Sequence, residues 1–169
     1  NGVIVNYNED GQKAEEENYK EGKHDGLWTK WYENGQKEWE TNYKVGKRDG
    51  LWIWWYENGQ RSREENYKEG KYHGLRTEWY ENGQTMMEAR YKDGKEDGLQ
   101  FYWYENGQKR HETNFKDGKL ISTEVWKPNG EKCPVTKIDK DGNGFLVAYN
   151  EDGTESSRAT YKDGQYVYD

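Results

Sequence analysis

A five-residue string, Tyr32-Glu33-Asn34-Gly35-Gln36, decides the fold, because it recurs unchanged at Tyr56, Tyr80 and Tyr104. Each copy begins 24 residues after the one before it. A second string, Tyr43-Lys44-Val45-Gly46-Lys47, alternates with the first and returns with small changes in the other repeats. Self-similarity at a fixed period of this length is typical of a repeat architecture. The sequence therefore predicts about seven units of 24 residues that follow one another without a linker.

The repeat covers the whole chain, so we expect a single domain over residues 1–169. The regular units lie near 2–25, 26–49, 50–73, 74–97 and 98–120. Two diverged units, 121–143 and 144–169, replace part of the pattern with aliphatic residues such as Val125 and Val147. Terminal repeats that depart from the pattern usually cap a stack. We expect these two units to be the cap.

Each unit contains two short segments that are suited to β-strands. The run Leu51-Trp52-Ile53-Trp54-Trp55-Tyr56 is aromatic and β-branched, and turn residues flank it on both sides. Two glycine turns per unit leave segments of only about seven residues, which is shorter than most helices. The predicted fold class is all-β, an elongated single-layer antiparallel meander of stacked β-hairpin repeats.

The type of turn determines which side chains share a face of the sheet. A three-residue loop at Glu33-Asn34-Gly35, with Gly35 in the left-handed region, pairs Tyr32 with Gln36. It sorts polar from apolar residues better than a two-residue turn does, and we expect the same loop at Lys44-Val45-Gly46. This choice predicts one face with Leu27, Trp31 and Tyr43 and an opposite face with Tyr32 and Glu40, each with its counterparts in other repeats.

The composition excludes several classes of protein. Leu, Ile, Val and Phe together make up roughly 12% of the chain, below the ~20% expected of a globular core, but there are 9 Trp and 15 Tyr. No apolar run is long enough for a transmembrane helix. The net charge of -7 argues against nucleic-acid binding and against broad adhesion to anionic lipid, although membrane contact stays open. The localisation is undetermined.

The chain offers few candidates for chemistry. Asp139, Asp141 and Asn143 match the first oxygen ligands of an EF-hand calcium loop, but Asn150 stands where a bidentate Glu belongs. This stretch also coincides with the turn found in every other repeat, so we predict a turn and no metal site. The three histidines and Cys133 form no set of groups at catalytic spacing. No cofactor is expected, and the protein is not expected to be an enzyme.

The unit Gly-Leu-Trp-x-x-Trp-Tyr-Glu-Asn-Gly-Gln, followed by Asn-Tyr-Lys-x-Gly-Lys, closely resembles the bacterial variant of the MORN repeat. Many members of that family are described as antitoxin-like proteins of the YwqK type. The resemblance is strong from Gly2 to Gly118 and weaker beyond. It implies a stack of β-hairpins, a role as a protein-binding scaffold and no catalytic residues. The antitoxin description implies a toxin as the partner.

Aromatic residues on the face of the recurring tyrosines are the best candidates for partner binding, because exposed Trp and Tyr dominate protein-binding hot spots. They are the recurring Tyr56, Tyr80 and Tyr104, together with Trp28, Trp52, Trp54 and Tyr102, which exceed the repeat. The leading hypothesis is a scaffold that binds a protein partner, such as a basic toxin, through this aromatic face. One alternative is a cell-surface carbohydrate or choline-type binding module. Another is end-to-end self-association through the edge segment Gly2-Val3-Ile4-Val5.

Overall fold

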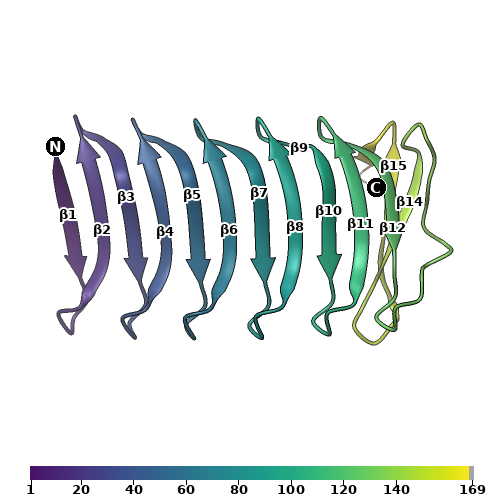
Figure 1. The fold of residues 1–169 in the computed structure, drawn as a ribbon, viewed down its shortest axis with the longest axis horizontal. Helices are drawn as coiled ribbons and strands as arrows, with labels where there is room; N and C mark the ends of the chain where they lie inside the picture. Colours follow the sequence, from purple (N-terminus) through teal and green to yellow (C-terminus); the bar gives the residue numbers. More distant parts are fainter. Residues whose placement is uncertain (168–169) are drawn as a thin grey trace. The chain divides into compact units, whose positions relative to one another are not determined.

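The computed structural model describes residues 1–167, and these divide into two compact units, residues 1–83 and residues 84–167. No helix occurs within residues 1–167. The single domain expected over residues 1–169 stays a prediction. The all-β class and the antiparallel meander are confirmed, since within each unit the strands form antiparallel sheets in which the longer strands follow one another in chain order (Figure 1).

The first unit is a meander of seven strands. Each strand is antiparallel to the one before it, and short turns join them. The strands are β1 (Gly2–Tyr7), β2 (Lys13–Lys20), β3 (Lys23–Trp31), β4 (Lys37–Lys44), β5 (Lys47–Trp55), β6 (Arg61–Lys68) and β7 (Lys71–Trp79).

The second unit contains two sheets. The first has β8 (Thr85–Lys92), β9 (Lys95–Glu96), β10 (Gly98–Trp103), β11 (Lys109–Lys116) and β12 (Lys119–Val125). The second has β13 (Lys137–Ile138), β14 (Gly144–Tyr149), β15 (Glu155–Lys162) and β16 (Gln165–Val167). The two diverged units were expected to continue the single layer. After β12 they form a separate sheet instead, which contacts β12 through β13 and β14.

An apolar core exists where these two sheets meet. It consists of Val125, Cys133, Val147 and Tyr149, with Phe145 and Leu146 packed against it. The aliphatic residues that distinguish the last two units therefore serve to join two layers. In the first unit, by contrast, the buried side chains are mainly polar, among them Thr29, Thr41 and Glu65.

The first turn of each repeat is the three-residue loop that the sequence predicts. The Tyr32 amide donates to the carbonyl of Gln36, and Gly35 has a φ of 80°. The second turn differs from the prediction, because Lys44 pairs with Lys47 and only Val45 and Gly46 lie between them. Both have positive φ, 51° and 79°, as a type I′ turn requires. The three-residue loop expected at Lys44-Val45-Gly46 is therefore wrong.

The predicted division of residues between the two faces is also wrong in part. An extra residue in β4 pairs Trp39 with Lys30, and a second irregularity near Gly50 pairs Thr41 with Trp52. Each bulge changes which side chains lie on the same side of the sheet. As a result Tyr43 lies with Trp28 and Trp52, whereas Leu27 and Trp31 lie on the other side with Glu40.

Candidate functional site

The two faces of the first unit differ in how much the repeats vary. On the ladder face the same residue types recur, and it carries Leu27, Leu51, Leu75, Trp31, Trp55, Trp79, Glu16, Glu40 and Glu64. On the variable face, most positions 24 residues apart carry different side chains, although Tyr recurs as Tyr19, Tyr43 and Tyr67. It carries Glu15, Glu17, Tyr19, His24, Trp28, Lys30, Trp39, Thr41, Tyr43, Arg48, Trp52, Trp54, Arg63, Glu65, Tyr67, Tyr72, Arg76 and Glu78.

This difference points to the variable face as the candidate site. Residues that recur make the contacts that every hairpin needs with its neighbours, because each repeat packs only on the adjacent repeats. On the ladder face, for example, the Lys13 ammonium lies 5.8 Å from the ring of Trp31, and Lys37 lies 5.6 Å from that of Trp55. These repeated contacts explain the recurring residues. Positions that differ between repeats are free to serve a particular ligand.

At the β2–β4 end of the variable face, rings stack on one another. The rings of His24 and Trp28 are parallel within 4° and 4.5 Å apart, and Trp39 meets Trp28 edge-on at 5.4 Å. The indole N–H of Trp28 donates to the Glu15 carboxylate over 2.8 Å. Such offset and edge-on arrangements are the favourable ones for aromatic pairs, so this end of the face is held rigidly.

In the middle of the face, cations lie over indole rings. Trp52 and Trp54 stack at 4.3 Å, and the Arg48 guanidinium lies 3.6 Å from the centre of the Trp52 ring. Arg63 lies 5.3 Å from the ring of Trp54. All of these side chains are half-buried. The Trp52 indole N–H is buried and has no acceptor among the described residues, which is uncommon for a buried donor.

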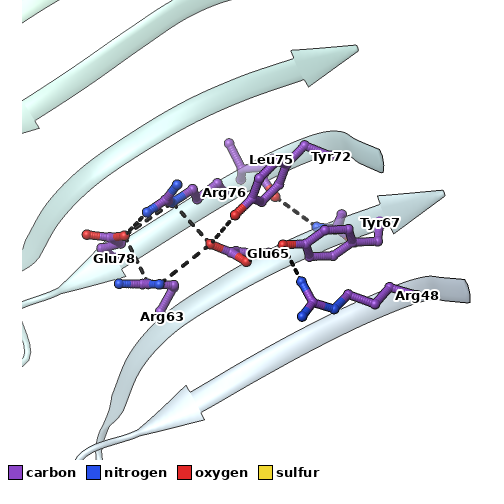
Figure 2. Close-up of polar contacts among 9 residues, drawn as sticks. Arg48, Arg63, Glu65, Tyr67, Tyr72, Leu75, Arg76 and Glu78 are labelled. Atoms are coloured by element: carbon purple, nitrogen blue, oxygen red, sulfur yellow. Dashed lines mark hydrogen bonds and ion pairs between the residues drawn. The ribbon is translucent and has the colours of Figure 1, made fainter. Parts of the chain in front are cut away.

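A buried carboxylate organises the β6–β7 end of the face (Figure 2). Glu65 is only 1% exposed. It accepts hydrogen bonds from the hydroxyls of Tyr67 at 2.9 Å and Tyr72 at 3.2 Å, and it pairs with Arg76 at 3.4 Å. Burial and these hydrogen bonds raise the pKa of the Tyr67 hydroxyl far above its usual range. Tyr67 therefore stays a neutral donor at any physiological pH.

Two arginines and a glutamate extend this network. Arg63 pairs with Glu78 at 3.0 Å and approaches Glu65 at 3.9 Å, while Arg76 also pairs with Glu78. The Arg48 guanidinium donates to the Tyr67 hydroxyl at 3.5 Å. A buried charge persists only when it is paired and hydrogen-bonded, and Glu65 meets both conditions. The network presents fixed charges beside the stacked indoles.

The structure brings three of the predicted site residues together and separates the others. Trp28, Trp52 and Trp54 share the variable face. Tyr56 belongs to the loop between β5 and β6, where its hydroxyl donates to the carbonyl of Trp79 over 2.6 Å. Tyr80 occupies the same repeat position, is half-buried and begins the turn that ends at Gly83. Tyr56 therefore links its repeat to the next one.

Tyr102 and Tyr104 lie in the second unit. Tyr104 is 1% exposed, and its hydroxyl donates to the carbonyl of Trp126, so its ring offers no surface to a partner in this structure. Tyr102 stacks on His111 at 4.0 Å and lines a cavity. Trp39, Arg48, Arg63 and Glu65 were not predicted from the sequence. Trp39, Arg48 and Arg63 differ from the residues at matching repeat positions, and this difference is a signal that the sequence contains; Glu65 gives no such signal, because Glu17 occupies the matching position.

The suspected calcium loop is an ordinary turn. The Asp139 carboxylate accepts the backbone amides of Asp141 and Asn143, both at 2.9 Å, and these bonds lower its pKa. The side-chain oxygen of Asn143 accepts the amide of Asp163 at 3.0 Å. Asp141 is exposed. Two of the three oxygen donors are thus engaged within the protein, and residues 1–167 contain no cluster of three or more potential metal ligands.

Cys133 is buried beside Tyr149, as expected of a structural thiol. Its sulfur lies 3.0 Å from the Tyr149 hydroxyl. Burial acts to raise the pKa of Cys133, but hydrogen bonds from Tyr149 and neighbouring groups outweigh it and lower the pKa.

Within the described part of the chain, no helix is both long and apolar enough to span a membrane.

Comparison with known families agrees with this architecture. The MORN repeat variant matches five stretches, residues 1–21, 25–44, 48–69, 72–93 and 96–117, and each contains one hairpin unit. The two diverged units lie outside these matches. No curated protein matches the chain. Since the matched repeats cover more than half of the sequence, the chain belongs to the MORN repeat variant family.

Proposed function

We propose that this chain is a non-catalytic β-repeat scaffold that binds a protein partner on the variable face of its first unit. One observation carries the proposal: differences between repeats concentrate on one face, and that face is rich in Trp and Arg. These residue types dominate protein-binding hot spots. The MORN repeat family is generally non-catalytic, which supports the first part of the proposal.

The fixed geometry of the face suits it to recognition. Arg48 is held over Trp52, and Arg63 and Arg76 are held by Glu65 and Glu78, so few side chains need to be ordered on binding. Preorganised side chains lose less conformational entropy when a partner docks. The net charge of -7 favours a basic partner, mainly by accelerating encounter. A basic toxin that this chain inhibits would fit both features.

Site-specific cross-linking tests the proposal. A photoreactive phenylalanine analogue replaces Trp54 on the variable face, and a matched probe replaces Leu51 on the ladder face. We expect the probe at position 54 to capture a defined protein that the probe at position 51 does not. Equal capture by both probes would contradict the proposal that the partner binds on the variable face.

The purified partner then permits a direct measurement. Trp52→Ala with Trp54→Ala should weaken its binding by about 100-fold, because hot-spot residues each contribute about 2 kcal/mol or more. Leu27→Ala with Leu51→Ala, on the ladder face, should leave the affinity within about twofold. The antitoxin role further predicts stoichiometric inhibition of the partner's activity. A partner that binds but retains full activity would support the scaffold and remove the antitoxin role.

A further inference from the structure

The second unit contains a cavity that the proposed function does not use. Its volume is about 390 Å³, which lies within the usual range for small-ligand sites. Residues of β9, β10 and β11 form one side, including Glu96, Tyr102 and Phe115. Residues of β14, β15 and β16 form the other, including Tyr161 and Tyr166. The cavity therefore lies between the two sheets of this unit.

Several aromatic rings line the cavity, beside polar groups such as Gln100 and Thr113. Tyr102 stacks on His111 at 4.0 Å, and Tyr161 meets Tyr166 edge-on at 5.9 Å. Burial, with a smaller contribution from the charge of Arg110, lowers the pKa of His111 to about 3. The imidazole is neutral at pH 7, so it acts as another aromatic wall and adds no positive charge.

A single carboxylate gives the cavity its charge. Glu96 accepts a hydrogen bond from the amide of Gln100 at 2.9 Å, and Gln100 is itself 1% exposed. After burial, the charge of Glu96 is the main cause that raises the pKa of Tyr161 on the opposite wall. Glu96 and Tyr161 thus line the same cavity. None of the described residues that line the cavity is Lys or Arg, and within residues 1–167 none pairs with Glu96.

In the first unit an arginine lies over the aromatic rings, and the cavity of the second unit has no such arginine at the matching position. Position 48 corresponds to position 96, and there the Arg48 guanidinium lies over the rings of Trp52 at 3.6 Å and Tyr67 at 5.4 Å. In the second unit the same position carries Glu96, and Phe115 replaces the tyrosine. The protein thus supplies its own cation to the rings of the first unit. In the cavity it supplies rings and a negative charge instead.

We propose that this cavity binds an organic cation with a methylated ammonium group. Aromatic faces attract such a cation through their quadrupole, and a nearby carboxylate adds a Coulombic attraction. The ammonium group can belong to a small molecule such as choline or to a trimethylated lysine side chain. The two sources present the same chemistry to the rings of Tyr102, Phe115, Tyr161 and Tyr166. The proposal is independent of the variable face.

Titration calorimetry with the full chain tests the proposal. Choline and a short peptide that contains trimethyllysine are the two probes, and 3,3-dimethyl-1-butanol is the neutral isostere of choline. We expect at least one of the charged probes to bind, and choline to bind at least about tenfold more tightly than its isostere if the ligand is a small molecule. Binding of only the peptide would identify a side chain as the source. Failure of both charged probes to bind would overturn the proposal, as would equal binding of choline and its isostere.

Substitutions locate the binding within the cavity. Glu96→Gln keeps an oxygen that can accept the hydrogen bond from Gln100, and it should weaken binding of the charged probe by about tenfold. Tyr166→Ala, at a ring that is 47% exposed, should weaken it by about fivefold. Glu124→Gln removes an exposed carboxylate of the same unit that pairs with Lys132, and it should leave the affinity for the probe unchanged. An unchanged affinity in both cavity variants would overturn this location.

Discussion

Glu65 shows how a sheet with little apolar interior can use a buried charge. Its carboxylate joins two tyrosine hydroxyls and two arginines from β6 and β7. The fold itself does not require a charge at this position, because Thr41 occupies it one repeat earlier and is also buried. The first repeat contains a simpler version of the network, in which Glu17 accepts the hydroxyl of Tyr19 and lies 3.6 Å from His24. The cost and benefit of the network are set by how completely the charge is paired.

Removing this carboxylate should be far more damaging than removing its sequence neighbour. Glu65→Ala leaves Tyr67 and Tyr72 without their acceptor and should lower the free energy of unfolding by about 3 kcal/mol. Glu64→Ala breaks only a pair with Arg61 on the ladder face and should cost less than about 1 kcal/mol. Urea denaturation followed by tryptophan fluorescence measures both. Equal losses would show that Glu65 is not the centre of the network.

At the scale of elements, the hairpins could be predicted because turn and strand signals repeat every 24 residues. The faces could not, because the prediction assumed regular pairing after each turn. The extra residue in β4 and the irregularity at Gly50 shift that pairing, and only the second has a local signal, since an isolated glycine within a strand suggests a bulge. Trp28, Trp52 and Trp54 were still recognised as candidates from their excess over the repeat. Arg48 could have been noticed because it differs from the repeat, but only the pairing of the strands shows that Arg48 and Glu65 lie beside Trp52 and Tyr67.

Val45 is the least suitable residue among the type I′ turns. It is β-branched, has a φ of 51° and is 59% exposed, while the matching turns carry Glu or Asp. Left-handed backbone is costly for a β-branched residue and easier for Asn. Val45→Asn should therefore raise the free energy of unfolding by about 1 kcal/mol, measured by urea denaturation.

The same substitution in the next repeat provides the control. Glu69 has the same φ of 51° without a β-branch, so Glu69→Asn should produce a smaller gain than Val45→Asn. The backbone amides of both residues keep their bonds to Asp25 and Asp49, since only the side chain changes. A gain at position 69 as large as at position 45 would argue against strain from the β-branch.

At the scale of the whole molecule, the low aliphatic content reflects how the repeats are built. Side chains of the first unit stabilise it through stacked rings, cations over rings and paired charges that span neighbouring hairpins. Among the described residues, a core of Val125, Val147 and Tyr149 forms in the second unit, where the small sheet covers β12. The sequence showed that the last units diverge, but it did not show that they form a second layer. That layer depends on contacts between segments far apart in the chain.

Two glycines with the same backbone conformation test how the second layer is attached. A Cβ on Gly142, at a φ of 80°, would meet the backbone nitrogen of Gly164 within the contact that joins this turn to Leu120. A Cβ on Gly153, at a φ of 83°, would meet nothing within 4 Å. Both alanine variants carry the same left-handed strain, so only Gly142→Ala adds a collision with backbone.

Gly142→Ala should therefore destabilise the second unit by at least about 2 kcal/mol more than Gly153→Ala. Hydrogen exchange measured by mass spectrometry should show faster exchange in β12 and β14–β16 of the first variant, with β1–β6 unchanged, because repeat proteins can open locally. Faster exchange throughout the chain would instead mean that the two units unfold as one. Equal exchange in both variants would mean that the close approach of Gly142 to Gly164 is not what holds the second sheet in place.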